Sequence, residues 1–202
     1  MTGVQTCALP IFTDTGSAPL LDLTGGAVSA RNGVLVSTAN GRLALNGPAL
    51  DRAGGTLTTT DDLFNVSGGG RLTSTGTGAL LGFANAAVNV GNASGDQLFV
   101  VTGTGSAATL AGPVLDASNT ALTLTGSAFV EVSSGATLTA PSAAPLTALS
   151  GGALSLGGAA GFLVSSTSPS TMGGSLLRTT GAGVTTTGNL VTVMNRDRKS
   201  VV

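Results

Sequence analysis

The sequence is poor in the side chains that carry most enzyme chemistry and most charge-driven binding. Of its 202 residues only 8% are charged, His, Trp and Tyr are absent, and Cys7 is the single cysteine. Without His the chain lacks the commonest general base and imidazole metal ligand, and one cysteine cannot form an internal disulfide. A net charge of −1 also lacks the basic surface that nucleic acid requires. The composition therefore predicts no nucleic-acid partner and argues against an enzyme.

Long hydrophobic runs are missing as well. Although 42% of the residues are hydrophobic, Gly or a polar residue interrupts every apolar run before the ~18 residues of a membrane-spanning helix. We therefore expect no membrane insertion of this segment. So high a hydrophobic share with so little net charge is not the composition of a disordered chain. The abundant residues are Gly, with 32 copies, and Thr, Ser, Ala, Val and Leu, which indicates a folded chain with many turns.

A degenerate repeat of roughly 31 residues occurs six times along the chain. The copies align on Pro19, Pro48, Ala79, Pro113, Pro145 and Ser175. The sixth position after each anchor is Gly or Asn, which tolerate the positive φ of a tight turn: Gly25, Gly54, Asn85, Asn119, Gly151 and Gly181. The ninth position is always apolar: Val28, Leu57, Val88, Leu122, Leu154 and Val184. The tenth is always polar: Ser29, Thr58, Asn89, Thr123, Ser155 and Thr185.

This alternation predicts short strands, because side chains along a strand point to opposite faces in turn. One strand per copy is expected at 27–30, 56–59, 87–90, 121–124, 153–156 and 183–186. A second is expected at 34–36, 63–66, 98–101, 129–132, 162–164 and 190–193. A further side is expected at 42–45, 71–73, 108–111 and 136–139. A single copy would leave its apolar side chains exposed, so we expect an all-β fold, a parallel β-solenoid of about six coils with three or four strands each.

Phenylalanines recur at nearly the same place in four consecutive copies, at Phe64, Phe99, Phe129 and Phe162. Leu35 and Val191 stand near that place in the first and last copies. Because Leu and Val flank these rings within predicted strands, we expect an internal aromatic stack rather than an exposed platform for sugars.

The two ends of the chain differ from the repeats. Residues 1–11 resemble the translation of a short-read sequencing adapter, and residues 197–202 resemble that of a second one. On this interpretation both segments are non-native and Cys7 belongs to the first. The natural segment is then residues 12–196, a single β-solenoid domain truncated at both ends.

Carboxylates are the candidate chemical groups, since an alternative function of such a fold is cleavage of polysaccharides. Asp22, Asp51 and Asp116 share one repeat position, where each is expected to accept a backbone N–H in a turn. Asp61 and Asp62 are adjacent and are expected in a solvated turn. Neither set predicts a catalytic centre or a metal ladder, so we assign no catalytic, cofactor-binding or metal-ligating residue and expect no cofactor.

Two surface features complete the candidates. Arg42 and Arg71 head equivalent strands in adjacent copies and predict a small basic column at an edge. The outward positions of the first strand are small, which leaves a flat glycan-binding or ice-binding face as a minor alternative. These pairs are Ala27 with Ser29, Thr56 with Thr58, Ala87 with Asn89, Ala121 with Thr123, Ala153 with Ser155, and Gly183 with Thr185.

The motifs GGTLTTT (54–60), GGGRLTST (68–75), SGATLT (134–139) and GGALSL (151–156) resemble the passenger regions of bacterial autotransporters and filamentous-haemagglutinin-like adhesins. The resemblance covers most of residues 13–193 and rests on repeat patterning. It implies a right-handed parallel β-helix that is exported to the extracellular space or the bacterial outer-membrane surface. It also implies an adhesive or structural stalk role, with a host-surface, glycan or self-association partner. Pectate-lyase-like enzymes are the alternative family of this shape.

Overall fold

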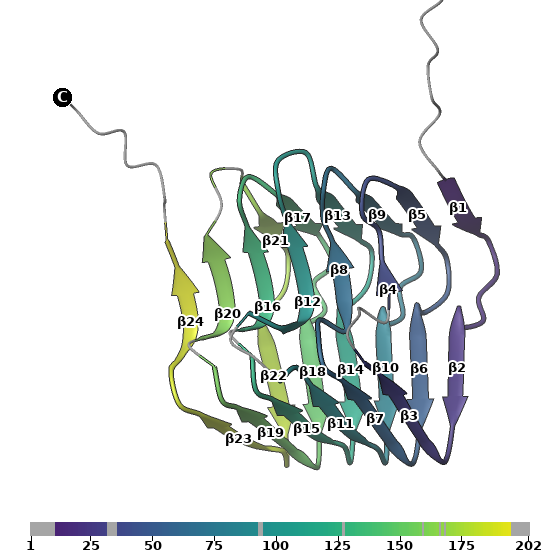
Figure 1. Ribbon diagram of the computed structural model, residues 1–202, viewed down its shortest axis with the longest axis vertical. Coiled ribbons are helices and arrows are strands. Elements are labelled where there is room, and N and C mark those ends of the chain that lie inside the picture. Colours follow the sequence, from purple (N-terminus) through teal and green to yellow (C-terminus); the bar gives the residue numbers. More distant parts are fainter. Residues whose placement is uncertain are drawn as a thin grey trace, which may run out of the picture.

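The computed structural model describes residues 11–31, 36–92, 95–126, 128–158, 160–165, 167 and 169–194. These residues form strands and turns, with no helix among them, in a β-solenoid of six coils (Figure 1). Each coil contributes four strands, and we number the coils 1 to 6 from β1–β4 to β21–β24. The all-β solenoid expected from the repeat is confirmed. The segments interpreted as adapter-derived are residues 1–11 and 197–202. Of these only Ile11, which begins β1, is among the described residues.

Two of the four sheets take the first and second strand of every coil. Sheet A contains β1 (Ile11–Asp14), β5 (Arg42–Leu45), β9 (Arg71–Ser74), β13 (Ala107–Leu110), β17 (Thr137–Ala140) and β21 (Thr171–Met172). Sheet B contains β2 (Leu21–Thr24), β6 (Leu50–Ala53), β10 (Leu81–Ala84), β14 (Leu115–Ser118), β18 (Thr147–Ser150) and β22 (Leu177–Thr180). Sheet B was not predicted as a set of strands from the alternation.

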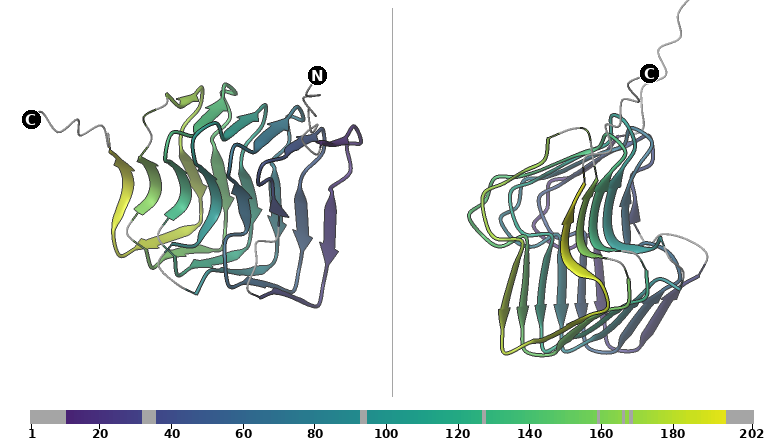
Figure 2. Two further views of the ribbon diagram at one scale, coloured as in Figure 1. Left: turned by 45° about the horizontal axis from the view of Figure 1, so that its top comes forward. Right: turned by 90° about the vertical axis from the view of Figure 1, so that its left-hand side faces the viewer.

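The other two sheets take the third and fourth strands, which are the two strand series expected most clearly from the alternation. Sheet C contains β3 (Ala27–Ala30), β7 (Thr56–Thr59), β11 (Ala87–Val90), β15 (Ala121–Leu124), β19 (Ala153–Leu156) and β23 (Gly183–Thr186). Sheet D contains β4 (Val36–Ser37), β8 (Phe64–Val66), β12 (Gln97–Thr102), β16 (Ala128–Ser133), β20 (Ala160–Ser165) and β24 (Asn189–Val193). In the right-hand view of Figure 2, coil 6 is nearest the viewer and the earlier coils lie behind it.

All strands pair in parallel with their equivalents in the neighbouring coils, and the register follows the repeat. In sheet C, Val28 pairs with Leu57, Leu57 with Val88, and Leu122 with Leu154. The predicted apolar column therefore forms one continuous line inside the solenoid, and the predicted polar column lies beside it on the outer face. Fully burying one Leu or Val side chain stabilises the fold by about 1.5–3 kcal/mol, so each coil gains from the coil above and below it.

The turn between sheets B and C explains the Gly and Asn column. Asn85 and Asn119 have φ values of 52° and 46°, and Gly54 has a φ of 68°. Each residue of the column also continues the ladder at the corner, as when the N–H of Asn85 donates to the carbonyl of Ser118 in the next coil. The positive φ inferred from the residue types is confirmed.

The aromatic stack is an exception to the expected register. All four phenylalanines are buried, as expected, but Phe99 pairs with Val130 rather than with Phe129. The rings form two separate pairs, Phe64 with Phe99 at 5.5 Å and Phe129 with Phe162 at 5.8 Å between centroids. The internal position predicted for the rings is therefore confirmed, and the stack divides into two pairs because Phe129 stands one residue earlier on its strand. Leu35 lies outside the described residues.

Candidate functional site

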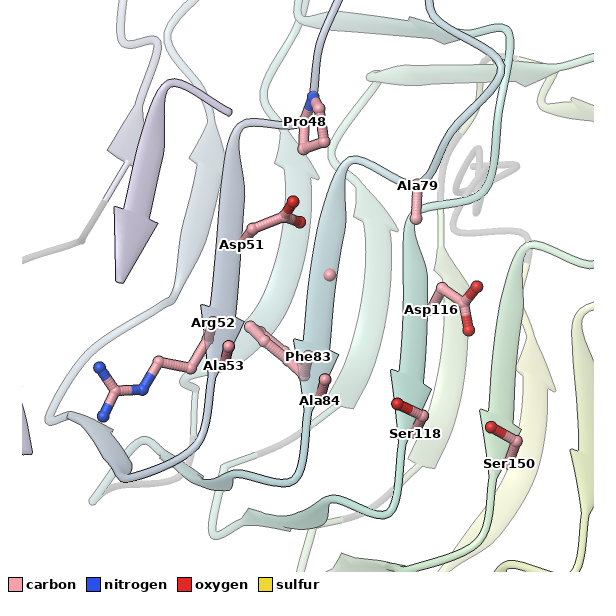
Figure 3. A pocket seen from close by; sticks show the side chains of 11 residues that line it. Pro48, Asp51, Arg52, Ala53, Ala79, Phe83, Ala84, Asp116, Ser118 and Ser150 are labelled. Atoms are coloured by element: carbon pink, nitrogen blue, oxygen red, sulfur yellow. The ribbon is translucent and has the colours of Figure 1, made fainter. Parts of the chain in front are cut away.

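The outer face of sheet B carries an open trough of about 520 Å³. Its floor is made of small residues, among them Ala53, Gly82 and Ala84, and Ser118 and Ser150 lie at one end of the strands. The side chains of Asp51 and Asp116 project on either side of β10 (Figure 3). The trough is thus a shallow polar surface whose shape comes from residues too small to fill it.

Sheet B brings together the three aspartates that share a repeat position. Asp22 pairs with Asp51 in adjacent coils, Asp51 pairs with Gly82, and Gly82 pairs with Asp116. All three aspartates lie within strands with their side chains on the outer face. The expectation that they sit in a turn was wrong, because the turn begins three residues later at the Gly or Asn position.

Gly82 determines where the carboxyl of Asp51 lies. A Cβ added at Gly82 would collide with Oδ1 of Asp51. The carboxyl of Asp51 therefore occupies the space over Gly82 that a side chain there would fill. Partial burial there raises the pKa of Asp51 above its ordinary value of 3.8, and the charge of Asp22 in the preceding coil raises it further. The trough therefore contains one carboxyl that holds its proton more tightly than an ordinary surface aspartate.

The chemical capacity of the trough is that of a hydrogen-bonding surface. Carboxylates and serine hydroxyls can accept and donate to the hydroxyl groups of a sugar chain. Two coils at about 4.8 Å each separate Asp51 from Asp116, so their backbones lie roughly 10 Å apart, slightly more than the ~6.5–9.5 Å between the two carboxyl groups of inverting glycosidases. Phe83 borders the trough but is buried, so no aromatic ring among the described lining residues is presented for stacking on a sugar.

Arg52 borders the same trough but its side chain points away from both carboxylates in Figure 3. It is 1% exposed, and Nη2 donates to the carbonyls of Gly26 at 2.6 Å and Thr56 at 3.2 Å. Its Nε and Nη1 are buried and have no hydrogen-bond partner within the described part of the chain. The arginine belongs to the corner between sheets B and C. Its burial was missed, although the repeat alignment carried a signal for it, because the equivalent residues in the neighbouring coils are Leu23 and Phe83.

The second acidic set lies at the corner between sheets C and D, where Asp62 is buried and Asp61 is partly exposed. Asp62 is 6% exposed, so the expectation of a solvated turn was wrong for this residue. Its carboxylate accepts the N–H of Gln97 in the next coil at 2.7 Å and the Nδ2 of Asn65 at 2.6 Å. Asp62 and Gln97 hold equivalent positions in coils 2 and 3. Coil 3 therefore covers Asp62.

The remaining surface candidates lie where the repeat predicts. Arg42 pairs with Arg71 on sheet A and both are exposed, which confirms a basic column at the surface. The outward positions of sheet C also align from coil to coil, for example Thr58 with Asn89 and Asn89 with Thr123. They form a flat face of small residues in which only coil 2 has two threonines.

Clusters of metal-ligating side chains and membrane-spanning helices are absent from the part of the chain that the structure describes. Across these ranges, no group of three or more His, Cys, Asp or Glu side chains is arranged to hold a metal ion. Nor does any helix there have the length and apolar character needed to span a membrane. Comparison of the chain with protein-family models, with curated proteins and with solved structures finds no match.

Proposed function

We propose that the chain is a segment of a secreted or cell-surface repeat protein in which the β-solenoid acts as an adhesive or structural stalk, without catalysis. The observation that carries the proposal is the unbroken register of all four sheets through six coils. A rod of this kind extends by about 4.8 Å for each coil added, and every coil contributes its own strip of outer surface. Such an arrangement suits a protein that must span a distance and present the same surface repeatedly.

The outer surface supports this role. Its strands present Ala, Ser, Thr and Asn, which keep a sheet face soluble without a high charge density. The resemblance of its motifs to autotransporter passengers and filamentous-haemagglutinin-like adhesins favours the same assignment and a location outside the cell or on the bacterial outer membrane. The partner would be a host-surface molecule or a glycan.

The trough on sheet B is the surface on which we propose adhesion occurs. It is concave, it presents carboxylates and hydroxyls, and it extends across several coils, so it fits an extended hydroxyl-rich chain better than a compact ligand. Asp51 and Asp116 would accept hydrogen bonds from sugar hydroxyls, and the small floor residues would let the chain approach the backbone.

Binding of the purified chain to a glycan array tests this proposal. We expect binding at micromolar or weaker affinity, with a clear loss in the Asp51→Asn/Asp116→Asn variant. Thr109→Asn on sheet A is the matched control, because it changes an exposed residue on a sheet outside both candidate glycan-binding faces and should leave binding unchanged. If no glycan or host-cell surface retains the chain, the adhesive role is wrong.

A second candidate, a polysaccharide-degrading solenoid, is favoured by one observation. The raised pKa of Asp51 is the property required of a general acid, and Asp116 lies two coils away. The same glycans should therefore be assayed for new reducing ends after incubation with the chain. If wild type releases reducing ends and Asp51→Asn does not, the chain is a hydrolase rather than a stalk.

A further inference from the structure

The trough on sheet B runs along the solenoid axis, so a chain bound in it crosses the strands one coil at a time. It extends from Asp51 in coil 2 to Ser150 in coil 5. One of its two outward columns consists of Asp51, Gly82 and Asp116. The other consists of small residues: Ala53, Ala84, Ser118 and Ser150. The trough therefore has the length and the flat floor that suit a polymer of several units.

The two carboxylates of the trough are spaced at the repeat of a polymer whose alternate units face the same way. Asp51 and Asp116 stand two coils apart, and both side chains lean toward the following coil (Figure 3), so their carboxyls keep the spacing of their backbones. That spacing is about 10 Å, twice the rise of one coil. In an extended β-1,4-linked sugar chain each ring is turned over relative to the one before it, and each ring is about as long as the rise of one coil. Alternate sugars of such a chain therefore present the same edge to Asp51 and Asp116.

The charge of the trough favours a cationic sugar over a neutral one. Among the described residues that line it, Arg52 is the cationic one, and its guanidinium is buried and points away from both carboxylates. Partial burial raises the pKa of Asp51 and the charge of Asp22 raises it further, so two effects oppose the ionised form of this carboxyl. A protonated amine beside Asp51 offsets both effects more than a neutral hydroxyl does, because it adds the opposite charge.

The same outward column shows where the acidic pattern stops. Arg178 lies two coils beyond Asp116, with Ala148 between them, and its side chain is exposed. An amino sugar over coil 6 would therefore meet a like charge. Asp22 lies one coil before Asp51, so it faces a sugar whose amino group is turned to the other edge. Asp51 and Asp116 are thus the two positions that match a run of amino sugars.

We infer that the trough binds a β-1,4-linked chain of amino sugars that lies along the solenoid axis, with the charged amino groups of alternate sugars beside Asp51 and Asp116. Each contact is a charge-assisted hydrogen bond from an ammonium group to a carboxylate. The small residues of the second column let the sugar rings lie close to the sheet. The inference rests on the proposed adhesive function and specifies the class of glycan that this surface recognises.

Three hexasaccharides of one linkage test the inference by isothermal titration calorimetry with the purified chain. They are the β-1,4-linked hexamers of glucosamine, N-acetylglucosamine and glucose, which differ only in the group on the second carbon. We expect the glucosamine hexamer to bind about four- to 25-fold more tightly than the other two, as two surface ion pairs would give. Added salt should reduce this preference. Equal binding of the glucose hexamer would overturn the inference and leave the adhesive function standing, whereas both fail if neither these hexamers nor any other glycan binds.

Loss of either carboxylate tests the two contacts. Asp51→Asn and Asp116→Asn should each weaken binding of the glucosamine hexamer by about two- to fivefold. The double variant should lose most of the preference for glucosamine over glucose. Asp14→Asn/Glu131→Gln is its matched control, because it removes two carboxylates from sheets A and D and should keep the wild-type affinity. An equal loss in the control would show that net charge, rather than the trough, governs binding.

A gain of binding tests the spacing of one sugar per coil. Arg178→Asp places a carboxylate two coils beyond Asp116 in the same column, so it should tighten binding of the glucosamine hexamer by about two- to fivefold. Arg71→Asp makes the same change in net charge at an exposed position on sheet A and should leave the affinity unchanged. Unchanged binding in Arg178→Asp, or an equal gain in Arg71→Asp, would overturn the inference.

Discussion

The carboxylate of Asp62 in coil 2 accepts a hydrogen bond from the backbone N–H of Gln97 in coil 3, with 2.7 Å between Oδ1 and the nitrogen. A titratable side chain thereby joins two coils at the corner between sheets C and D. The pKa of Asp62 is raised from 3.8 to about 6, and burial is the largest cause. The hydrogen bonds from Asn65 and Gln97 lower it, and the charges of Asp61 and Asp96 raise it further.

This pKa predicts a solenoid that is more stable in mild acid than at neutral pH. The folded-state pKa lies above the unfolded value, so the stabilisation by the protonated form is fully present below about pH 4 and is lost as the pH rises through about 6. Thermal unfolding at pH 4.5 and pH 7.5 should show a difference on the order of 1–3 kcal/mol in favour of pH 4.5. Asp51, whose pKa is also raised, acts in the same direction.

Asp62→Asn should remove most of this pH dependence and raise the stability at pH 7.5. The new amide oxygen can still accept the N–H of Gln97. Asn65 now turns its Nδ2 toward Oδ2 of Asp62, so its amide must rotate by 180° to accept from the new NH2 group. That rotation gives a donor to Oδ1 of Asn65, which is buried and has no hydrogen-bond partner among the described residues. Asp116→Asn, at an exposed aspartate, is the control and should keep the wild-type pH profile. A wild-type profile in Asp62→Asn would show that the effect arises elsewhere.

Replacement of Arg52 by Leu should stabilise the fold. Two buried nitrogens of the guanidinium lack partners within the described residues, and each unsatisfied donor costs about 1–3 kcal/mol. Leu23 and Leu149 occupy the same interior column, so leucine suits the position. The carbonyl of Gly26 keeps its bond from the N–H of Thr56. Urea denaturation should give Arg52→Leu a free energy of unfolding about 1–3 kcal/mol above wild type.

Arg52→Ala separates the removal of the charge from the filling of the space. It removes the same unsatisfied nitrogens but leaves a cavity, so it should be less stable than Arg52→Leu by about 2–5 kcal/mol. A leucine variant less stable than wild type would mean that the two hydrogen bonds of Nη2 outweigh the unsatisfied nitrogens.

Gly54 offers a test of the corner geometry alone. It has a φ of 68°, and a Cβ added there would meet no atom within 4 Å. Gly54→Ala should therefore destabilise the fold through backbone strain by about 1–2 kcal/mol, without any steric clash. Gly54→Asn should be closer to neutral, because Asn85 and Asn119 already adopt this conformation in coils 3 and 4. Equal midpoints for the two variants in thermal unfolding would contradict this explanation.

Leu122 and Thr123 test the alternation on sheet C. Leu122 lies in the closed interior column and Thr123 is exposed on the same strand. Leu122→Ala should cost about 2–5 kcal/mol, because it leaves a cavity between coils 3 and 5. Thr123→Ala should change the stability by less than about 0.5 kcal/mol. Similar losses for both variants in chemical denaturation would place the two side chains in similar environments, against the register described above.

The repeat itself was sufficient to predict the class of fold and the sheet C columns. Val28, Leu57 and Leu122 align because a period of two within each strand and a period of roughly 31 between strands both appear in the residue order. The positive φ at Asn119 was predictable for a related reason, since few residue types tolerate that conformation. These features depend on the conformational preferences of single residue types and on the equivalence of the repeat copies. Both can be read from the order of the residues.

Burial and proximity at the corners were decided only by the tertiary structure. Whether Asp62 meets solvent depends on which residue of coil 3 lies above it, and whether Phe129 stacks on Phe99 depends on a shift of one residue in strand alignment. The trough likewise exists because Gly82 falls between Asp51 and Asp116 once three coils are in register. A repeat of variable length specifies that coils stack, but insertions of a few residues set the local alignment, and only the folded chain resolves it.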